Sequence, residues 1–250
     1  MPATDWGWQI TADEIAAWTI RNDDDVLVIN KPALVVCHPS KKGPWSSLVG
    51  ACREYLGVER LHMPSRLDRE TSGVVIFAKH AAKASQLQKA IQMRAVNKSY
   101  FAVLCGEMHE AVVVDQPIGL HGASPVYTRR AVQADGQAAE TEFVPVSVAG
   151  GYTLACVAPH TGRMHQIRVH AQWLGFPIVG DKIYGGDDTL YLQFIEHGFT
   201  AALEQKLLLP RQALHAARLE FQLEGGVEIF EAPLAGDLVE FCREHQLYLP

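Results

Sequence analysis

The amino-acid sequence predicts an α+β fold, in which a central mixed and largely antiparallel β-sheet is flanked by helices. Several apolar segments have the length and composition of strands, and few have the periodicity of helices. Many of these strand-like segments are separated by turns such as Asp135-Gly136, Gly150-Gly151 and Gly225-Gly226. Because a tight turn can join antiparallel neighbours, whereas parallel strands need a long crossover, this spacing favours antiparallel pairing.

The N-terminal part of the sequence predicts a short helix and then a strand. Thr11 and Glu14 have the spacing of a capping box and stand just before Ile15, so we expect a helix to begin there. Residues 25–30, Asp-Val-Leu-Val-Ile-Asn, have the composition of a strand, which Pro32 ends.

The middle of the sequence continues this pattern. Residues 74–79 predict another strand, and residues 81–94 predict a helix with Leu87 and Ile91 facing inward. Four further segments have the composition of strands, at residues 96–105, 140–148, 151–158 and 214–222.

Residues 160–186 predict a helix that Thr161 caps and that ends at Gly175, with Pro177 just beyond. By helical spacing, one face of this helix is apolar and another is polar. The apolar face comprises Met164, Ile167, Ala171 and Leu174, and the polar face comprises His165, Arg168 and Gln172. The polar face could line a binding cleft, but for a typical helix a solvated face is the simpler interpretation.

The charges are distributed unevenly along the chain, whose formal net charge is -6. Residues 60–100 contain eight Lys or Arg against two acids, whereas residues 220–244 contain seven acids against Arg243 alone. The net charge therefore does not exclude a nucleic-acid partner. A solvated helix face carrying Lys83, Lys89 and Arg94 accounts for part of the basic excess.

Other features of composition are typical of a globular protein of the cytoplasm. The N-terminus has no basic and apolar regions of a secretory signal, and no apolar run is long enough to span a bilayer. The five cysteines are scattered without a C-x-x-C pair, which argues against a zinc site or a disulfide framework.

The segment at residues 65–73, just before an apolar strand, is the best candidate for a catalytic loop. Its Asp68 stands between Arg66 and Arg69, whose positive charges favour an ionised carboxylate. Such an anion suits a nucleophile or a base better than a general acid. From composition alone, however, a plain turn is the better interpretation, since the segment is rich in turn-forming residues.

Five segments in order resemble the RluA-type family of RNA pseudouridine synthases. SRLDRETSGVVIFAK (65–79) resembles the catalytic-loop motif of that family, and VNKSYFAVLCG (96–106) resembles its Lys-x-Tyr strand. TGRMHQIRVHAQWLGFPIVGDKIYG (161–185) resembles its third motif. The other two segments are DDDVLVINKPALVVCHP (23–39), similar to its first strand, and LHAARLEF (214–221), similar to a late strand.

The resemblance implies a pseudouridine synthase-like catalytic domain at residues 23–250, preceded by an N-terminal extension at residues 1–22. No S4-like RNA-binding domain, which many relatives carry, is expected. Ser65 departs from the usual His before Arg-Leu-Asp, and residues 119–130 depart from a more basic stretch. Contacts with the substrate are therefore least transferable at residues 119–130.

The resemblance also implies site residues, each with a simpler alternative. Asp68 matches the essential aspartate, Tyr100 the active-site tyrosine, and Arg168 the arginine that pairs with the aspartate and orients it. Without the motif, Tyr100 would be interpreted as a buried strand aromatic. The implied substrate-binding residues are Arg66, Arg163 and His165, of which Arg66 is otherwise a plain surface arginine.

The implied reaction breaks the N-glycosidic bond of a uridine, turns the uracil and joins its C5 to C1′ of the same ribose. It follows base flipping into a pocket. No cofactor or metal is expected, and Asp68 either attacks C1′ or removes the 2′-proton. The expected partner is a ribosomal or transfer RNA stem-loop, with no DNA and no membrane, bound by a monomer. The basic excess should border the binding cleft, and the acidic C-terminal stretch should lie away from it.

Two other functions compete with this hypothesis. A glycoside hydrolase also acts at a glycosidic carbon, but it needs two carboxylates across the bond, and Glu70 lies only two residues from Asp68. A catalytically inactive RNA-binding module is the second alternative. The presence of Asp68, Tyr100 and Arg168 together argues against it.

Overall fold

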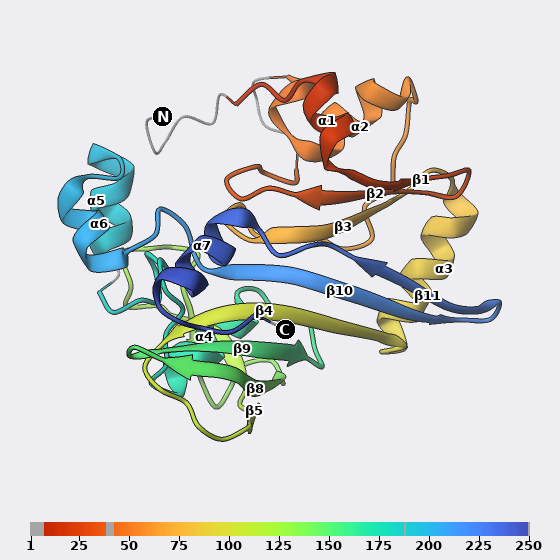
Figure 1. The fold of residues 1–250 in the computed structure, drawn as a ribbon. Coiled ribbons are helices and arrows are strands. Elements are labelled where there is room, and N and C mark those ends of the chain that lie inside the picture. The colour runs from red at the N-terminus through yellow and green to blue at the C-terminus, as the bar shows by residue number, and fades with distance from the viewer. Residues whose placement is uncertain (1–7, 39–42, 188, 250) are drawn as a thin grey trace. The chain divides into compact units, whose positions relative to one another are not determined.

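The computed structural model describes residues 8–38, 43–187 and 189–249. The chain divides into two compact units, whose helices and strands are labelled in Figure 1. The N-terminal unit contains the described residues up to Lys98 together with Ala216–Ala235. The central unit contains the described residues of Ser99–His215 and those from Gly236 onward.

Strands of the N-terminal unit pair mainly in antiparallel fashion. Strands β1, β2 and β3 follow one another as antiparallel neighbours. Strand β10 comes next in the order, and β11 pairs with it as a hairpin. Their bounds are β1 (Thr19–Asn22), β2 (Val26–Lys31), β3 (Ser72–Ala78), β10 (Leu214–Leu223) and β11 (Gly226–Glu231).

Strands β2 and β3 are buried on both faces, because helices pack against each side of them. Val28 and Ile76 pack with Leu87 of α3 on one face. Ile29 and Phe77 pack with residues of α1 and α2 on the other face. The helical elements of this unit are α1 (Ala12–Trp18), α2 (Leu48–Leu56), α3 (Ala81–Gln92) and the 3-10 turn η1 (Pro44–Ser46).

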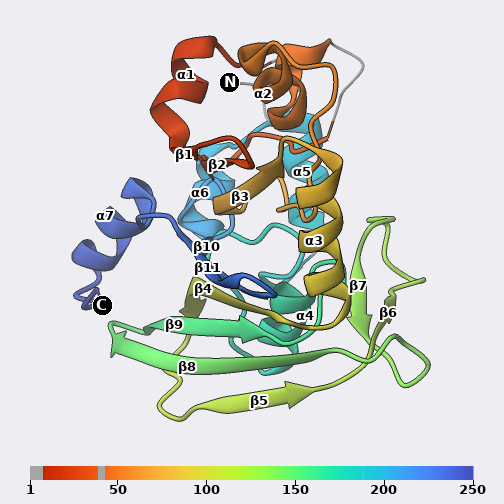
Figure 2. The same cartoon turned by 90° about the vertical axis from the view of Figure 1, so that its right-hand side faces the viewer.

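The central unit contains a second set of antiparallel strands, in the order β4, β9, β8 and β5. Figure 2 shows helix α4 beside β8 and β9, and the hairpin β6–β7 to one side of these two strands, where β7 also contacts α4. The bounds are β4 (Val96–Cys105), β5 (Val112–Asp115), β6 (Ile118–Leu120), β7 (Arg130–Val132), β8 (Glu140–Ala149), β9 (Tyr152–Pro159) and α4 (Gln166–Trp173).

Three further helices complete the central unit. Helices α5 (Thr189–His197) and α6 (Ala201–Leu207) have an apolar cluster of their own, which includes Phe194 and Leu203. In α7 (Gly236–Glu244), the ring of Phe241 meets the ring of Tyr152 on β9 edge to face, with centroids 5.3 Å apart.

The predicted fold class is confirmed, since most strands pair antiparallel and helices flank them. The predicted strands all occur, with bounds that differ by one or two residues. The capping box is also confirmed. The Thr11 hydroxyl accepts from the Glu14 backbone N–H at 3.2 Å, and the Glu14 carboxylate accepts from the Thr11 backbone N–H at 2.8 Å.

The predicted start of the helix at Thr161 is wrong. Helix α4 begins at Gln166, because the Thr161 hydroxyl donates to the Gln166 side chain at 2.6 Å instead of capping a helix. The predicted end is confirmed. Gly175, at φ +84°, lies just past the helix, and the Phe176 backbone N–H bonds to the Ala171 carbonyl, which is the pattern of a Schellman motif.

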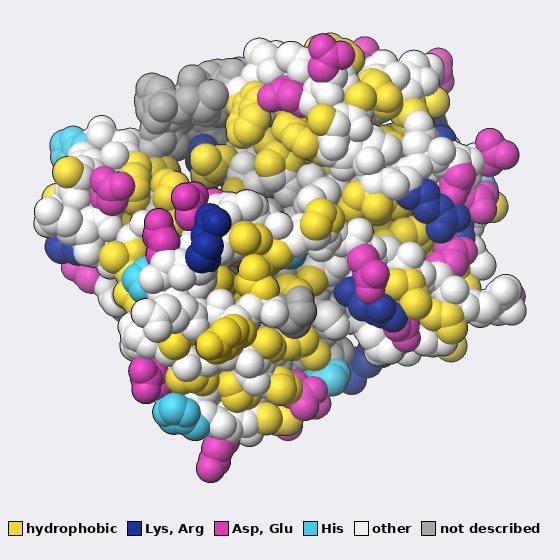
Figure 3. All heavy atoms as spheres, in the orientation of Figure 1, with side chains coloured by type: hydrophobic (Ala, Val, Ile, Leu, Met, Phe, Trp, Pro, Cys, Tyr) yellow, Lys and Arg dark blue, Asp and Glu magenta, His cyan; other side chains and the backbone are white. Residues whose placement is uncertain are grey.

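The predicted separation of basic and acidic stretches is wrong for helix α3. Lys83 forms an ion pair with Glu228, and Lys89 pairs with Glu224 at 3.2 Å. These acids belong to the hairpin β10–β11, which packs near α3 and neutralises part of the basic excess. On the face drawn in Figure 3, the described Lys and Arg side chains lie among Asp and Glu and form no continuous basic surface.

Candidate active site

The loop that carries Asp68 lies directly before strand β3, in the N-terminal unit. Asp68 is half-buried, and its carbonyl oxygen accepts a hydrogen bond from the Thr71 backbone N–H at 3.2 Å. The loop therefore contains the turn that its composition predicts. Arg66 is exposed, two residues before the aspartate. A turn and an exposed arginine are compatible with a catalytic loop, because functional side chains are often presented from ordered turns.

A buried lysine fastens this loop to the end of strand β2. Lys31 has no exposed surface, and its Nζ donates to the carbonyl oxygens of Pro32 and Val35, each at 2.9 Å. The same Nζ donates to the carbonyl of Arg69 at 3.0 Å. Three directed hydrogen bonds offset the cost of burying the ammonium group. Lys31 thereby fixes the backbone at the residue next to Asp68.

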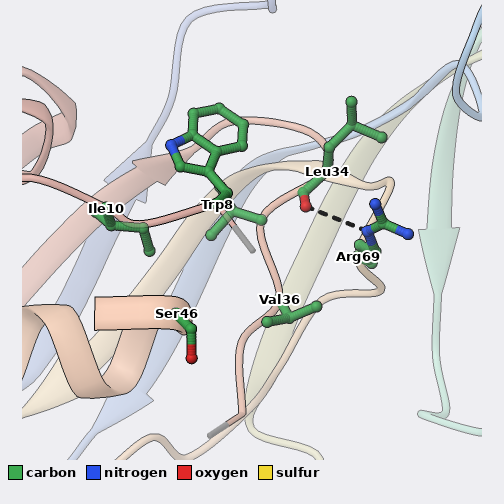
Figure 4. A pocket seen from close by; sticks show the side chains of 7 residues that line it. Trp8, Ile10, Leu34, Val36, Ser46 and Arg69 are labelled. Carbon is green, nitrogen blue, oxygen red and sulfur yellow. Dashed lines mark hydrogen bonds between the residues drawn. The ribbon is translucent and has the colours of Figure 1, made fainter. Parts of the chain in front are cut away.

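Two more contacts join the segment after β2 to the loop. The Cys37 thiol lies 3.4 Å from the Leu67 carbonyl oxygen, to which it donates. Arg69 Nε donates to the Leu34 carbonyl at 3.3 Å, and Figure 4 shows this bond at the rim of a small pocket. Burial raises the pKa of the Cys37 thiol, which keeps it protonated as a donor. The backbone is thus held on both sides of Asp68.

Gly73 lets strand β3 approach β10 just beyond the loop. Its φ is +112°, and a Cβ at this position would stand 2.1 Å from the Ala216 carbonyl oxygen. Only glycine avoids both the strained backbone and this overlap. The Ser-Gly pair that follows Asp68 therefore has a structural reason that is separate from chemistry.

Tyr100 lies on strand β4 of the central unit, opposite Val157 on β9. It is half-buried, whereas Ala102, Val103 and Leu104 further along β4 are fully buried. Tyr100 thus retains exposed surface that the strand's core residues lack. The simpler interpretation of a wholly buried strand aromatic does not hold.

Arg168 is buried in helix α4 and paired with a carboxylate that the sequence analysis did not single out. Its Nε donates to Asp181 Oδ2 at 2.7 Å, and its Nη2 donates to Asp181 Oδ1 at 2.9 Å. Asp181 has no exposed surface, and its Oδ1 also accepts from two backbone N–H groups. Burial opposes its ionisation, but the charge and hydrogen bonds of Arg168 outweigh that effect and hold the pKa of Asp181 below its usual range.

The ring of Tyr184 supports the same guanidinium from its face. The Arg168 Cζ lies 4.9 Å from the ring centroid, a distance at which a cation and an aromatic face attract. The guanidinium of Arg168 is thus held at one edge by the carboxylate of Asp181 and on its face by the ring of Tyr184. Such a double restraint leaves the guanidinium little freedom to rotate.

The solvated face that we considered for this helix is wrong at Arg168. From Gln166 to Ala171, every residue of α4 is buried, whereas Trp173 at its end is exposed. His165 precedes the helix at φ +58°, and its Nδ1 lies 2.9 Å from the Tyr184 hydroxyl. Arg163 is half-buried and donates from Nε to the Ala138 carbonyl at 3.0 Å. The helix is buried because its polar groups find partners inside the protein.

A hydrogen-bond chain supplies those partners. The Gln166 side chain donates to the Thr141 hydroxyl at 2.9 Å, and His170 Nδ1 lies 2.8 Å from the same hydroxyl. His170 Nε2 lies 3.0 Å from the Gln116 carbonyl. Burial lowers the pKa of His170, so the ring is neutral, with Nε2–H as donor and Nδ1 as acceptor. This chain ties α4 to strand β8.

Three residues that support the site were not predicted individually, although each lies within one of the segments that carry the family resemblance: Lys31, Asp181 and Tyr184. One signal could have found two of them. Lys31 follows the apolar run Val-Leu-Val-Ile after one intervening residue, Asn30, and Asp181 follows Pro-Ile-Val-Gly. A charged residue at the end of a buried run needs a specific partner. That argument names the residue, but its partner is separated by too many positions to be inferred.

Within the described part of the chain, no group of three His, Cys, Asp or Glu side chains is placed to hold a metal ion. Across the same residues, no helix combines the length and hydropathy needed to cross a membrane. Of the predicted site residues, Asp68 and Arg66 belong to the N-terminal unit, and the others belong to the central unit. In the central unit, Arg168 and His165 both contact Tyr184.

Comparison with known proteins identifies the family. The family of RNA pseudouridylate synthases, as represented by its sequence model, matches residues 25–173, which include Asp68, Tyr100 and Arg168. This chain belongs to that family. It is therefore an isomerase that converts uridine to pseudouridine in RNA. The glycoside hydrolase alternative is wrong, because members of this family rejoin the base to the same ribose.

Relatives of this pseudouridine synthase are similar over nearly its whole length. Ribosomal large subunit pseudouridine synthase D of Vibrio vulnificus is 35% identical over 238 residues, which are 93% of this chain and 71% of the relative. An uncharacterized RNA pseudouridine synthase of Bacillus subtilis is 34% identical over 241 residues, covering 94% of this chain and 78% of the relative.

Solved structures support the same fold for this synthase. Human RNA Pseudouridylate Synthase Domain Containing 4 is 25% identical, with a TM-score of 0.75 over 96% of this chain and 97% of the human one. Human RNA Pseudouridylate Synthase Domain Containing 1 is 21% identical, with a TM-score of 0.69 over 91% of this chain and 94% of the other. At 21% identity, the similarity to the second human protein supports the fold alone.

Proposed function

We propose that this synthase modifies uridine in the RNA of the large ribosomal subunit, with Asp68 as its catalytic residue. The proposal rests chiefly on the relatives. Proteins 33% to 35% identical to this chain, from Vibrio vulnificus and Nitrosomonas europaea, are named for the ribosomal large subunit. The matched region contains Asp68 in a loop whose backbone Lys31 holds from the neighbouring residue.

Asp68 acts on the ribose of the flipped uridine, either by attacking C1′ or by removing the 2′-proton. Its loop supports this assignment, since the aspartate is half-buried and its backbone is fixed on both sides. A fixed loop holds a reacting carboxylate in one geometry, which lowers the entropic part of the barrier. The proton at uracil C5 must leave before the product forms.

Tyr100 stacks on the uracil, and Arg168 orients Asp68 and favours its ionised form. The pairing of Arg168 with Asp181 supports the second role, because Asp181 takes the Nε and Nη2 donors on one edge of the guanidinium. A guanidinium held by one fixed carboxylate can present its other edge in a defined direction.

Arg66, Arg163 and His165 contact the RNA in this proposal, and Arg66 enters the stack that the target base leaves. The exposure of Arg66 suits such a role. The catalytic domain is residues 23–250, with residues 1–22 as an extension. Ile10 and Ile15 of that extension are buried in the core of the N-terminal unit, so the described part of the extension stabilises the domain.

The substrate is tested by mapping pseudouridine in total RNA with and without the gene that encodes this chain. We expect sites to disappear from large-subunit ribosomal RNA and to return when the wild-type gene is supplied. A gene carrying Asp68→Asn serves as the matched control and should not restore them. Loss of sites from transfer RNA alone would overturn the ribosomal assignment and leave the isomerase activity intact.

A further inference from the structure

Tyr184 occupies a junction in the central unit. Its side chain has no exposed surface and lies in an apolar cluster with Val169 and Ile183. Its backbone N–H donates to Asp181 Oδ1 at 3.0 Å, so Tyr184 also helps to fix the carboxylate that holds Arg168. The backbone of Tyr184 thus contacts Asp181, while its ring contacts Arg168 and its hydroxyl contacts Arg130 and His165.

The ring of Tyr184 faces arginines from two elements. Arg168 of α4 has its Cζ 4.9 Å from the ring centroid, and Arg129 next to β7 has its Cζ at 6.0 Å. A cation over an aromatic face is attracted by the ring quadrupole, most strongly where water is excluded. Because Arg168 is buried, its contact is the stronger of the two.

The hydroxyl of Tyr184 holds the hairpin β6–β7 and His165. It accepts from the Arg130 backbone N–H at 2.9 Å, and it lies 2.9 Å from His165 Nδ1. Arg130 is the first residue of β7, so this bond fixes the point at which the hairpin returns to the body of the unit. The loop of the hairpin carries Tyr127, which is 85% exposed, followed by Arg129 and Arg130.

We propose that Tyr184 is a positioning residue that couples the hairpin β6–β7, as an RNA-contacting element, to the orientation of Arg168. This inference rests on the proposed role of Arg168. The ring keeps the guanidinium in plane with Asp181, and the hydroxyl keeps the hairpin and His165 in place for RNA. An exposed aromatic beside two arginines suits a nucleobase and its phosphates. We therefore expect the ring to affect kcat and the hydroxyl to affect the KM for RNA.

The experiment compares Tyr184→Phe with Tyr184→Leu. Phenylalanine keeps the ring and loses the hydroxyl, so kcat stays within about twofold of wild type while the KM for RNA rises about threefold or more. Leucine also loses the ring, so kcat falls about tenfold. Tyr191→Leu is the matched control, because Tyr191 packs at the edge of the same cluster. It should leave kcat within about twofold of wild type.

A spectroscopic measurement separates positioning from general loosening of the core. We expect the Arg168 Nε–H resonance to be slow in solvent exchange in wild type and in Tyr184→Phe, since this proton is bonded to Asp181. In Tyr184→Leu it should exchange faster, whereas Tyr191→Leu should leave it unchanged. If leucine prevents folding, the phenylalanine variant still tests the proposal through its kcat, its KM and this resonance.

The outcomes distinguish this inference from the function on which it rests. If Arg168→Ala retains wild-type turnover, the proposed role of Arg168 fails. If Arg168→Ala is inactive but Tyr184→Leu keeps the wild-type kcat and the slow resonance, the positioning role of Tyr184 is wrong. A drop in kcat for Tyr184→Phe equal to that for leucine would also overturn it, because the ring would then not be what aligns Arg168.

Discussion

Lys31 and Asp181 are buried charged residues that hold the groups to which we assign the chemistry. Each is surrounded by directed partners, three carbonyls for Lys31 and a guanidinium with two N–H groups for Asp181. Burying an ion is costly unless its partners are in place. Each of these residues therefore keeps its hydrogen-bond partners in position. At the scale of single residues, the site depends on these supports as well as on its reacting groups.

Replacing Asp68 by Asn separates chemistry from recognition. The amide keeps the size of the carboxylate but removes its charge and nucleophilicity, so turnover should vanish while RNA binding survives. The assay follows release of the C5 hydrogen from uridine-labelled RNA, which the isomerisation requires. Glu70→Gln, in the same loop, is the matched control and should stay active. A rate near wild type for Asp68→Asn would refute the assignment.

Replacing Asp181 by Asn should lower the free energy of unfolding at neutral pH by about 3 kcal/mol, because it leaves the buried Arg168 without its counter-charge. Chemical denaturation followed by circular dichroism measures this loss. Asp135→Asn, at an exposed carboxylate, should change the stability little and serves as the control. Equal stability of both variants would contradict the energetic importance of the Arg168 pair.

The same pair makes a contribution that depends on pH. The pKa of Asp181 is lowered in the folded state, so the pair stabilises the protein above the unfolded pKa, near the ordinary value of 3.8. That stabilisation is lost as the pH falls through the folded pKa. Wild type should therefore lose more stability than Asp181→Asn when the pH is lowered from 5 toward 3. Parallel stability curves for the two proteins over this range would contradict the expectation.

At the scale of elements, most strands could be predicted from the sequence and some helices could not. Strands β2 and β3 are apolar runs bounded by polar residues, and burial on both faces leaves such runs easy to recognise. Helices α5 and α6 were missed although Gly198 and the N-cap Thr200 lie between them, because their apolar cluster is small. The start of helix α4 was predicted four residues too early, since Thr161 bonds to a side chain that only the folded loop brings near it.

The junction between the Asp68 loop and strand β3 gives a prediction at this scale. Gly73→Ala should destabilise the protein by about 3 kcal/mol or more, because the added Cβ would overlap the Ala216 carbonyl and the backbone has φ +112°. Gly122→Ala, where no atom lies within 4 Å of the added Cβ, is the control and should be nearly neutral. Thermal unfolding compares the two, and similar midpoints would mean that β3 can shift away from β10 at little cost.

For the molecule as a whole, the family and its chemistry could be predicted from the motifs, whereas the partners of the buried charged residues that support the site could not. Asp68, Tyr100 and Arg168 each stand in a recognisable motif. Asp181 pairs with Arg168 across 13 residues, and Lys31 reaches Arg69 across 38. Nothing local in the sequence marks such pairs, because they arise only when distant segments pack. The pairing of basic α3 with acidic β10–β11 was mispredicted for the same reason.

Binding to RNA gives a prediction for the whole molecule. Affinity should fall steeply as salt rises, since each phosphate contact releases counterions. Arg66→Ala should make the slope of log affinity against log salt shallower by about one. Lys89→Ala is the matched control, because this lysine already pairs with Glu224. It should leave the slope unchanged, and an affinity that does not depend on salt would contradict electrostatic binding altogether.

Because three carbonyls surround the Lys31 Nζ, opening of the Asp68 loop can be measured in solution through this amine. An amine-reactive reagent needs a free amine with access to solvent, and the Lys31 Nζ gains that access only when its bonds to the segment after β2 and to Arg69 break together. The rate at which Lys31 is acylated therefore reports how often the loop opens. Bound RNA, by holding the loop closed, should protect this one amine from the reagent.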